Sequence, residues 1–144
     1  MSISKSPLTI AQEAAPSPET IGAFADGFEA YNSRFAGPEN ETPLWLIARD
    51  AEGAVCGGLK GQTSWDWLYV DWLWIADAHQ RTGAGSELLA RAEAFARGRN
   101  CAGVFLNTYS FQAPEFYPRH GYTEFGRLEG FPTGHRQIWF AKRF

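Results

Sequence analysis

The segment from residue 65 to residue 97 constrains the fold more than any other part of the chain. An apolar and aromatic run at residues 65–76 is typical of a buried strand, and a glycine-bearing turn at residues 80–86 follows it. Beyond this turn the apolar period changes from two to 3.6, which predicts a helix that ends near Gly98. The apolar stretch at residues 102–107 completes a strand–helix–strand unit, whose two strands we expect to pair in parallel. The residues expected on the buried face of the helix are Gly85, Leu88, Leu89, Ala92, Phe95 and Ala96.

Shorter patterns on either side of this unit predict further strands and helices. Ser17 is placed to cap the first helix, with Pro18 at its first position, and residues 50–53 are placed to turn a hairpin. Residues 61–64 are expected to form a loop, and Gly103 to mark a bulge or a close backbone approach. The additional strands are expected at residues 8–14, 44–49, 54–60, 122–128 and 136–142, and the additional helices at residues 19–35 and 113–120.

Size and charge exclude several classes of protein. The 144 residues suit one domain over residues 1–144, and 13 Lys and Arg against 16 Asp and Glu give a net charge of −3. This balance favours neither a nucleic-acid partner nor an electrostatic membrane anchor, and no apolar run reaches the roughly 18 residues of a membrane span. We therefore expect a soluble, cytoplasmic protein. Two distant cysteines, Cys56 and Cys101, are expected to be reduced structural thiols.

The aromatic content of the chain is high and uneven. Aromatic residues make up 15% of the sequence, and four of the six tryptophans lie between Trp65 and Trp74. One explanation is a central strand covered on both faces, where large side chains bury much apolar surface. The other is a wall against which a ligand stacks. We favour the core, because aromatic side chains are more often packed inside.

The turn at residues 80–86 carries the strongest chemical signal. Glycines at a strand-to-helix junction let backbone N–H groups converge on an anion, and the helix dipole favours negative charge there. A pyrophosphate group fits this description. No Gly-Lys-Ser/Thr follows, as a Walker-type loop requires, and the first glycine of GxGxxG is missing. The alternative is that these glycines only allow close packing.

Two motifs in this order resemble the GCN5-related N-acetyltransferase (GNAT) family. Gln80, Gly83 and Gly85 match its [Q/R]-x-x-G-x-[G/A] signature, and residues 111–122 resemble its A-x-x-F-Y-x-x-x-G-[FY] segment. The resemblance is strong over residues 73–125. It implies an α/β (α+β) fold with one GNAT-like domain. It further implies a mixed sheet of six to seven strands with splayed parallel central strands, flanked by three to four helices.

The family resemblance implies acetyl-CoA as co-substrate and no metal. The main chain of Leu73, Trp74 and Ile75 would contact the pantetheine arm and the acetyl carbonyl, and Asn107 would touch the same arm. Arg81 stands where the family often has glycine. The residues expected around the pyrophosphate are Gln80, Arg81, Thr82, Gly83, Ala84, Gly85 and Ser86.

The resemblance also implies catalytic roles. Tyr117 matches the tyrosine that in many relatives protonates the departing CoA thiolate, although a Tyr in a Phe-Tyr pair is often only a core residue. We choose Asp71 as the general base, because apolar neighbours would raise its pKa; the alternative is that it pairs with a basic side chain. The histidines His79, His120 and His135 are weaker candidates for the base, and their spacing predicts no metal site.

These features predict an N-acetyltransferase that moves an acetyl group from acetyl-CoA to a primary amine of a small molecule or peptide. A catalytically silent acyl-CoA-binding sensor is the first alternative, and a hydrolase using Cys56, Cys101 or a histidine is the second. The acceptor amine is not readable from the sequence. Exposed strand edges and apolar residues near the C-terminus predict a homodimer.

Overall fold

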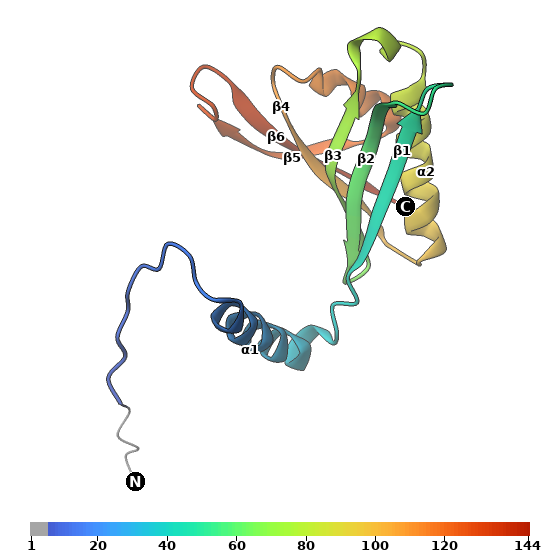
Figure 1. The fold of residues 1–144 in the computed structure, drawn as a ribbon. Coiled ribbons are helices and arrows are strands. Elements are labelled where there is room, and N and C mark those ends of the chain that lie inside the picture. Colours follow the sequence, from blue (N-terminus) through green and yellow to red (C-terminus); the bar gives the residue numbers. More distant parts are fainter. Residues whose placement is uncertain (1–5) are drawn as a thin grey trace. The chain divides into compact units, whose positions relative to one another are not determined.

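Six strands form one mixed sheet in the computed structural model, which describes residues 6–144 (Figure 1). The strand order is β1-β2-β3-β4-β6-β5, and β3 and β4 are the parallel pair. This topology confirms the predicted mixed sheet with a parallel centre. The strands are β1 (Thr42–Arg49), β2 (Val55–Ser64), β3 (Trp67–Ile75), β4 (Gly103–Tyr109), β5 (Thr123–Glu129) and β6 (Arg136–Arg143).

One face of the sheet is covered by helix α2 (Ala84–Gly98), as Figure 1 shows. Leu88, Leu89, Ala92 and Ala96 are its buried residues, which confirms most of the predicted apolar face. They pack against the inward side chains of the central strands, including Leu68 and Val104. Three short 3₁₀ helices connect the larger elements: η1 (Asp77–His79), η2 (Pro114–Phe116) and η3 (Pro118–His120).

The chain divides into two compact units at Pro38, and helix α1 (Pro18–Ala36) belongs to the first. The Ser17 hydroxyl accepts a hydrogen bond from the Thr20 main chain, and Pro18 occupies the first turn, as predicted. The predicted strand at residues 8–14 is wrong, because no segment of residues 6–144 pairs with it. One helix stripe carries exposed apolar side chains: Ile21, Phe24, Phe28, Tyr31 and Phe35.

Two further predicted elements differ from the structure. Residues 61–64 continue β2 instead of forming a loop, and the turn into β3 is made by Trp65 and Asp66, both with positive φ. The helix predicted at residues 113–120 is two separate 3₁₀ turns. Pro114 and Pro118 lack the N–H that a continuous α-helix needs, so the regular ladder is interrupted. Gly121 then ends the segment in the left-handed conformation, as expected.

A β-bulge decides which side chains of β3 face α2. Lys60 pairs with Trp72 and Gly61 pairs with Val70, so Asp71 is an extra residue in the β2–β3 ladder. The extra residue shifts the alternation of side chains by one position. The inward side chains of β3 are therefore Leu68 and Val70 before the bulge, and Leu73 and Ile75 after it.

The tryptophans of β3 lie on the face opposite α2, Trp72 and Trp74 because of the bulge and Trp67 because of the ordinary alternation before it. Trp72 and Trp74 are 61% and 55% exposed, and Trp67 is half-buried against Phe105. The expectation that these rings fill a core covered on both faces is therefore wrong. Only the aliphatic side chains of β3 enter the core beneath α2.

The structure also bears on three smaller predictions, which concern Gly103, the two cysteines and membrane-spanning segments. A Cβ at Gly103 would collide with the Lys142 carbonyl and the Trp67 ring, so this glycine marks a close approach. Cys56 and Cys101 are both free thiols. Across residues 6–144, every helix is too short or too polar to cross a membrane.

Candidate functional site

The turn between β3 and α2 is tied together by its own side chains. Gln80 Nε2 donates to the Ile75 carbonyl at 3.2 Å, and also to Asp77 Oδ1 at 3.2 Å. Thr82 Oγ1 donates to the His79 carbonyl at 2.6 Å. Two of the predicted ligand-binding side chains, Gln80 and Thr82, therefore hold the turn in shape.

The first turn of α2 presents unpaired N–H groups. Gly83 is its N-cap in the left-handed conformation (φ 86°), and no side chain caps the helix. The first N–H groups of an α-helix have no acceptor within the helix, and the dipole makes this end positive. A Cβ at Gly83 would have no atom within 4 Å, and one at Gly85 would reach only the Phe116 ring at 3.4 Å. The helix end is therefore open enough for a phosphate-sized anion.

The two central strands diverge next to this turn. β3 and β4 pair from Trp67–Gly103 to Val70–Leu106, after which β3 stays with β2 while β4 stays with β6. Figure 1 shows this divergence, which we call the fork. Within residues 6–144, the β4-facing edge of β3 has no partner strand along residues 71–75. Main-chain groups that point to this edge are open to a ligand, although Trp74 is paired with Gly58 of β2 and the Ile75 carbonyl accepts from Gln80 Nε2.

Tyr117 lies between η2 and η3 on the α2 side of the sheet. Its ring is 7% exposed and packs against Phe116, Tyr122 and Phe140, with centroids 5.2, 5.9 and 5.6 Å away. Its hydroxyl makes no hydrogen bond within residues 6–144, but the oxygen is not fully buried. It therefore retains some accessible surface. Burial raises the pKa of the Tyr117 phenol to about 12, so the group keeps its proton at physiological pH.

Asp71 lies on the opposite face of the sheet and is already paired. Its carboxylate is 2.9 Å from Lys60 Nζ, and both side chains are about one-third exposed. The Lys60 ammonium also lies over the rings of Trp72 and Trp45, 4.8 and 5.6 Å from their centroids. The structure thus realises the alternative in which Asp71 pairs with a basic side chain.

Asn107 belongs to a hydrogen-bonded chain that crosses three strands. Its Nδ2 donates to the Tyr69 hydroxyl at 2.8 Å, and its Oδ1 accepts from Gln137 Nε2 at 3.1 Å. Desolvation, and secondarily the charge of Asp71, raise the pKa of Tyr69. Tyr69 and Gln137 were not predicted as site residues. The contact between Tyr69 and Asn107 comes from the β3–β4 pair, whereas the contact between Gln137 and Asn107 depends on β6 inserting beside β4, which no local pattern reveals.

The histidines have separate structural roles. His120 bridges the two motif segments, with Nδ1 2.8 Å from the Phe116 carbonyl and Nε2 2.9 Å from Ser86 Oγ. His135 Nδ1 lies 3.4 Å from Ser110 Oγ, and His79 closes η1. Among residues 6–144, no three His, Cys, Asp or Glu side chains gather as metal ligands would. The contact between His120 and Ser86 was also missed by the sequence patterns.

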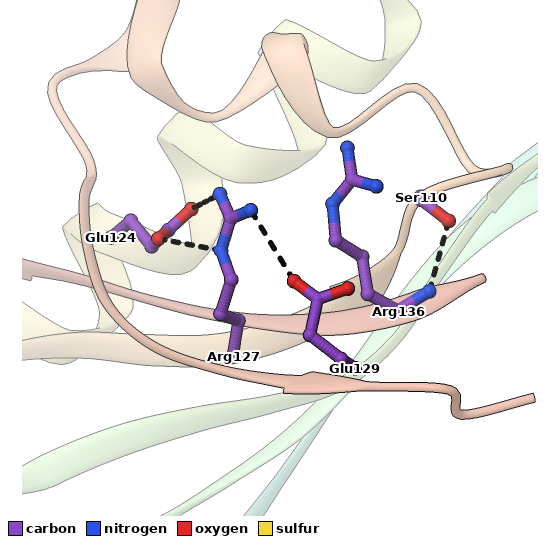
Figure 2. Close-up of polar contacts among 5 residues, drawn as sticks. All are labelled: Ser110, Glu124, Arg127, Glu129 and Arg136. Atoms are coloured by element: carbon purple, nitrogen blue, oxygen red, sulfur yellow. Dashed lines mark hydrogen bonds and ion pairs between the residues drawn. The ribbon is translucent and has the colours of Figure 1, made fainter.

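A separate ionic cluster lies on β5 and β6. Figure 2 shows Arg127 between Glu124 and Glu129, at 2.7 and 3.7 Å, with Arg136 beside them. The Arg127 hydrogen bond lowers the pKa of the Glu124 carboxyl. The Arg136 main chain donates to Ser110 Oγ at 3.1 Å, while its Nε is buried without a partner among the described residues. The cluster joins β5 to the start of β6, where Glu129 pairs with Arg136 in the ladder.

Comparisons with known proteins agree with this arrangement. The model of the acetyltransferase (GNAT) family matches residues 7–122. The chain is 36% identical to Acetyltransferase Atu2258 of Agrobacterium fabrum, over 88% of this chain and 92% of that protein. It is 45% identical to Blasticidin-S acetyltransferase of Streptomyces morookaense, over 64% of this chain and 71% of that protein.

A solved structure extends the agreement to three dimensions. The crystal structure of an acetyltransferase from Bacillus cereus superposes with a TM-score of 0.83 at 31% identity, covering 93% of this chain and 98% of that one. The two family motifs lie in the turn before α2 and in the η2–η3 segment, with β4 between them. With the family model matching most of its length, the chain belongs to the GNAT family of acetyltransferases.

Proposed function

We propose that this acetyltransferase uses acetyl-CoA and transfers the acetyl group directly to a primary amine of a small molecule or peptide. The observation that carries the proposal is the uncapped first turn of α2, which opens beside the fork. Its N–H groups and positive dipole end suit the pyrophosphate of CoA. Acetyl-CoA supplies an activated thioester; the chain supplies binding, orientation and proton transfer.

The main chain does most of the binding in this proposal. The N–H groups of Gly83 to Ser86 hold the pyrophosphate, and the free edge of β3 at Leu73 holds the pantetheine arm. The glycines leave room for close approach, since a Cβ at Gly83 would point into open space. A backbone N–H on the same edge of β3 is suited to stabilise the developing oxyanion.

Proton transfer falls to groups on opposite faces of the sheet. Tyr117, with an accessible hydroxyl and a raised pKa, holds a proton for the departing sulfur. Asp71, on the other face, remains our choice for the base. Its carboxylate lies 2.9 Å from Lys60 Nζ, so an arriving amine would meet it beside this partner.

The relatives and the surface favour a small-molecule acceptor. One similar protein is named as a Blasticidin-S acetyltransferase. Trp72 and Trp74 present exposed rings on the face opposite α2, just beyond the fork, as an aromatic wall for an acceptor would require. The relative's name supports a small-molecule acceptor, and the exposed rings support one with an apolar or planar surface.

The two alternatives make different predictions. A silent sensor would bind CoA without turning over acetyl-CoA. A thiol hydrolase is disfavoured because burial raises the pKa of the Cys101 thiol and so depletes its nucleophilic thiolate. Cys56 donates to the Ala54 carbonyl, and within residues 6–144 no basic side chain hydrogen-bonds to its thiol.

The test combines binding with turnover. Calorimetry should show CoA binding that is abolished in Gly83→Val, because a β-branched residue at φ 86° both strains the turn and covers the N–H groups. Gly53→Val is the matched control, because Gly53 also has a φ of 86° and a Cβ there would meet nothing within 4 Å, but it lies in the β1–β2 turn. A screen of acetyl-CoA against polyamines, aminoglycosides, nucleoside amines and peptide N-termini then identifies the acceptor. Unchanged CoA affinity in Gly83→Val would refute the binding site.

A further inference from the structure

We propose that His120 controls the direction of the hydrogen bond made by the Ser86 hydroxyl, so that binding of the CoA pyrophosphate draws a proton onto His120. The inference rests on the proposed acetyl-CoA site and adds a positioning residue to it. It also makes cofactor binding dependent on pH.

The hydrogen-bond directions follow from the chemistry of the partners. The Phe116 carbonyl can only accept, so the hydrogen on a neutral His120 ring belongs on Nδ1, 2.8 Å away. Nε2 is then an acceptor, and the Ser86 hydroxyl 2.9 Å away must donate to it. The single proton of Ser86 is used by His120 in this state.

This state is poorly suited to an anion at the helix end. With its proton turned to His120, Ser86 Oγ can offer only lone pairs to a phosphate oxygen. When Nε2 takes a proton from solvent, its N–H donates to Ser86 Oγ, and the serine proton is released to point at the phosphate. The protonated ring also places a positive charge behind the serine. Pyrophosphate binding and protonation of His120 therefore favour each other.

The charged groups around His120 leave this coupling intact. On α2, Glu87 follows Ser86 and is paired with Arg91 at 2.9 Å. On β6, the Lys142 ammonium donates to the His120 main-chain carbonyl at 3.0 Å and is neutralised by Glu93. Arg119 precedes His120 on η3, and η2 contributes the neutral Phe116 ring at 4.4 Å. Since these charges do not change on binding, the added pyrophosphate charge drives proton uptake.

Calorimetry in buffers of different ionisation enthalpy measures the protons taken up with CoA. Between pH 6 and 8.5 the wild-type protein should take up more protons than His120→Gln, whose side chain is neutral at every pH. Comparison with His120→Gln subtracts the protons taken up by the 3′-phosphate of CoA, whose second pKa is about 6. His135→Gln is the matched control, because His135 contacts Ser110 outside the turn before α2, and it should behave as the wild type.

Affinity provides a second measurement. Ser86→Ala should weaken CoA binding about tenfold at pH 6, where the freed hydroxyl contacts a phosphate, and about twofold or less at pH 8.5. In the wild-type protein, ¹⁵N NMR should show the Nε2 signal of His120 moving from unprotonated to protonated when CoA is added near pH 7. This measurement needs no variant and so survives a folding defect in His120→Gln.

The possible results distinguish a failure of the His120 proposal from a failure of the proposed acetyl-CoA site. Proton uptake that is equal in the wild type and His120→Gln, or an Nε2 signal unmoved by CoA, would overturn the inference while leaving the CoA site standing. If CoA binds to none of these proteins, the proposed function fails and the inference fails with it.

Discussion

Replacing Tyr117 with Phe isolates the proposed acid from the core packing around it. The substitution keeps the ring that packs between Phe116, Tyr122 and Phe140, and removes only the hydroxyl. That hydroxyl has no hydrogen-bond partner within residues 6–144, so its loss should change the free energy of unfolding by less than about 0.5 kcal/mol. CoA affinity should also be unchanged.

The size of the expected rate loss follows from acidity. The Tyr117 phenol has a pKa of about 12, whereas a free thiol has a pKa of about 8.5. Because the phenol is the weaker acid, complete proton transfer from it to the thiolate costs about 5 kcal/mol. The phenol therefore acts mainly by hydrogen bonding to the sulfur as charge develops. We expect the turnover of Tyr117→Phe to fall by about 10²-fold, the lower end of the range for general acids.

The turnover is measured by following release of the CoA thiol from acetyl-CoA with the best acceptor from the screen. Until an acceptor is found, slow hydrolysis of acetyl-CoA is measured instead. Tyr122→Phe is the matched control, since its hydroxyl donates to Glu93 at 3.2 Å and should cost stability rather than turnover. The reasoning is refuted if Tyr117→Phe retains full activity, or if it melts several degrees lower with unchanged activity per folded molecule.

Three further predictions test other parts of the structure. Burial raises the pKa of Tyr117 from the usual 10 to about 12, so the stabilisation that its neutral form provides is complete below pH 10 and is lost as pH rises through about 12. Burial raises the pKa of Tyr122 as well, so its contribution changes in the same direction. Urea unfolding between about pH 9 and 11.5 should show this decline, and Tyr117→Phe should show less of it. Asp71→Asn should lower turnover while changing stability by about 1 kcal/mol or less, because its ion pair with Lys60 is partly exposed; unchanged turnover would remove Asp71 as the base. Sedimentation at micromolar concentration should show a homodimer, and a lone 16.0 kDa species would contradict it.

The sequence by itself determined the elements that depend on residues only a few positions apart, such as helix starts and tight turns. Ser17 and Pro18 fix the start of α1, and Asp50 turns the β1–β2 hairpin by accepting hydrogen bonds from the Glu52 and Ala54 main chains. The change of period after residue 83 fixes the face of α2 that is buried. Each signal works because a residue within a few positions supplies the hydrogen bond or the apolar spacing. The parallel β3–β4 pair followed from the same local unit.

Tertiary structure alone decided the functional details of the site. The bulge at Asp71 turned Trp72 to the face opposite α2, because an extra residue in one strand shifts every later side chain to the other face. The insertion of β6 beside β4 brought Gln137 to Asn107, and η3 brought His120 to Ser86. These partners are 30 and 34 positions apart in sequence. Residue type and spacing predict which groups bind an anion, but which groups meet depends on how the chain closes distant loops, and no local preference encodes that.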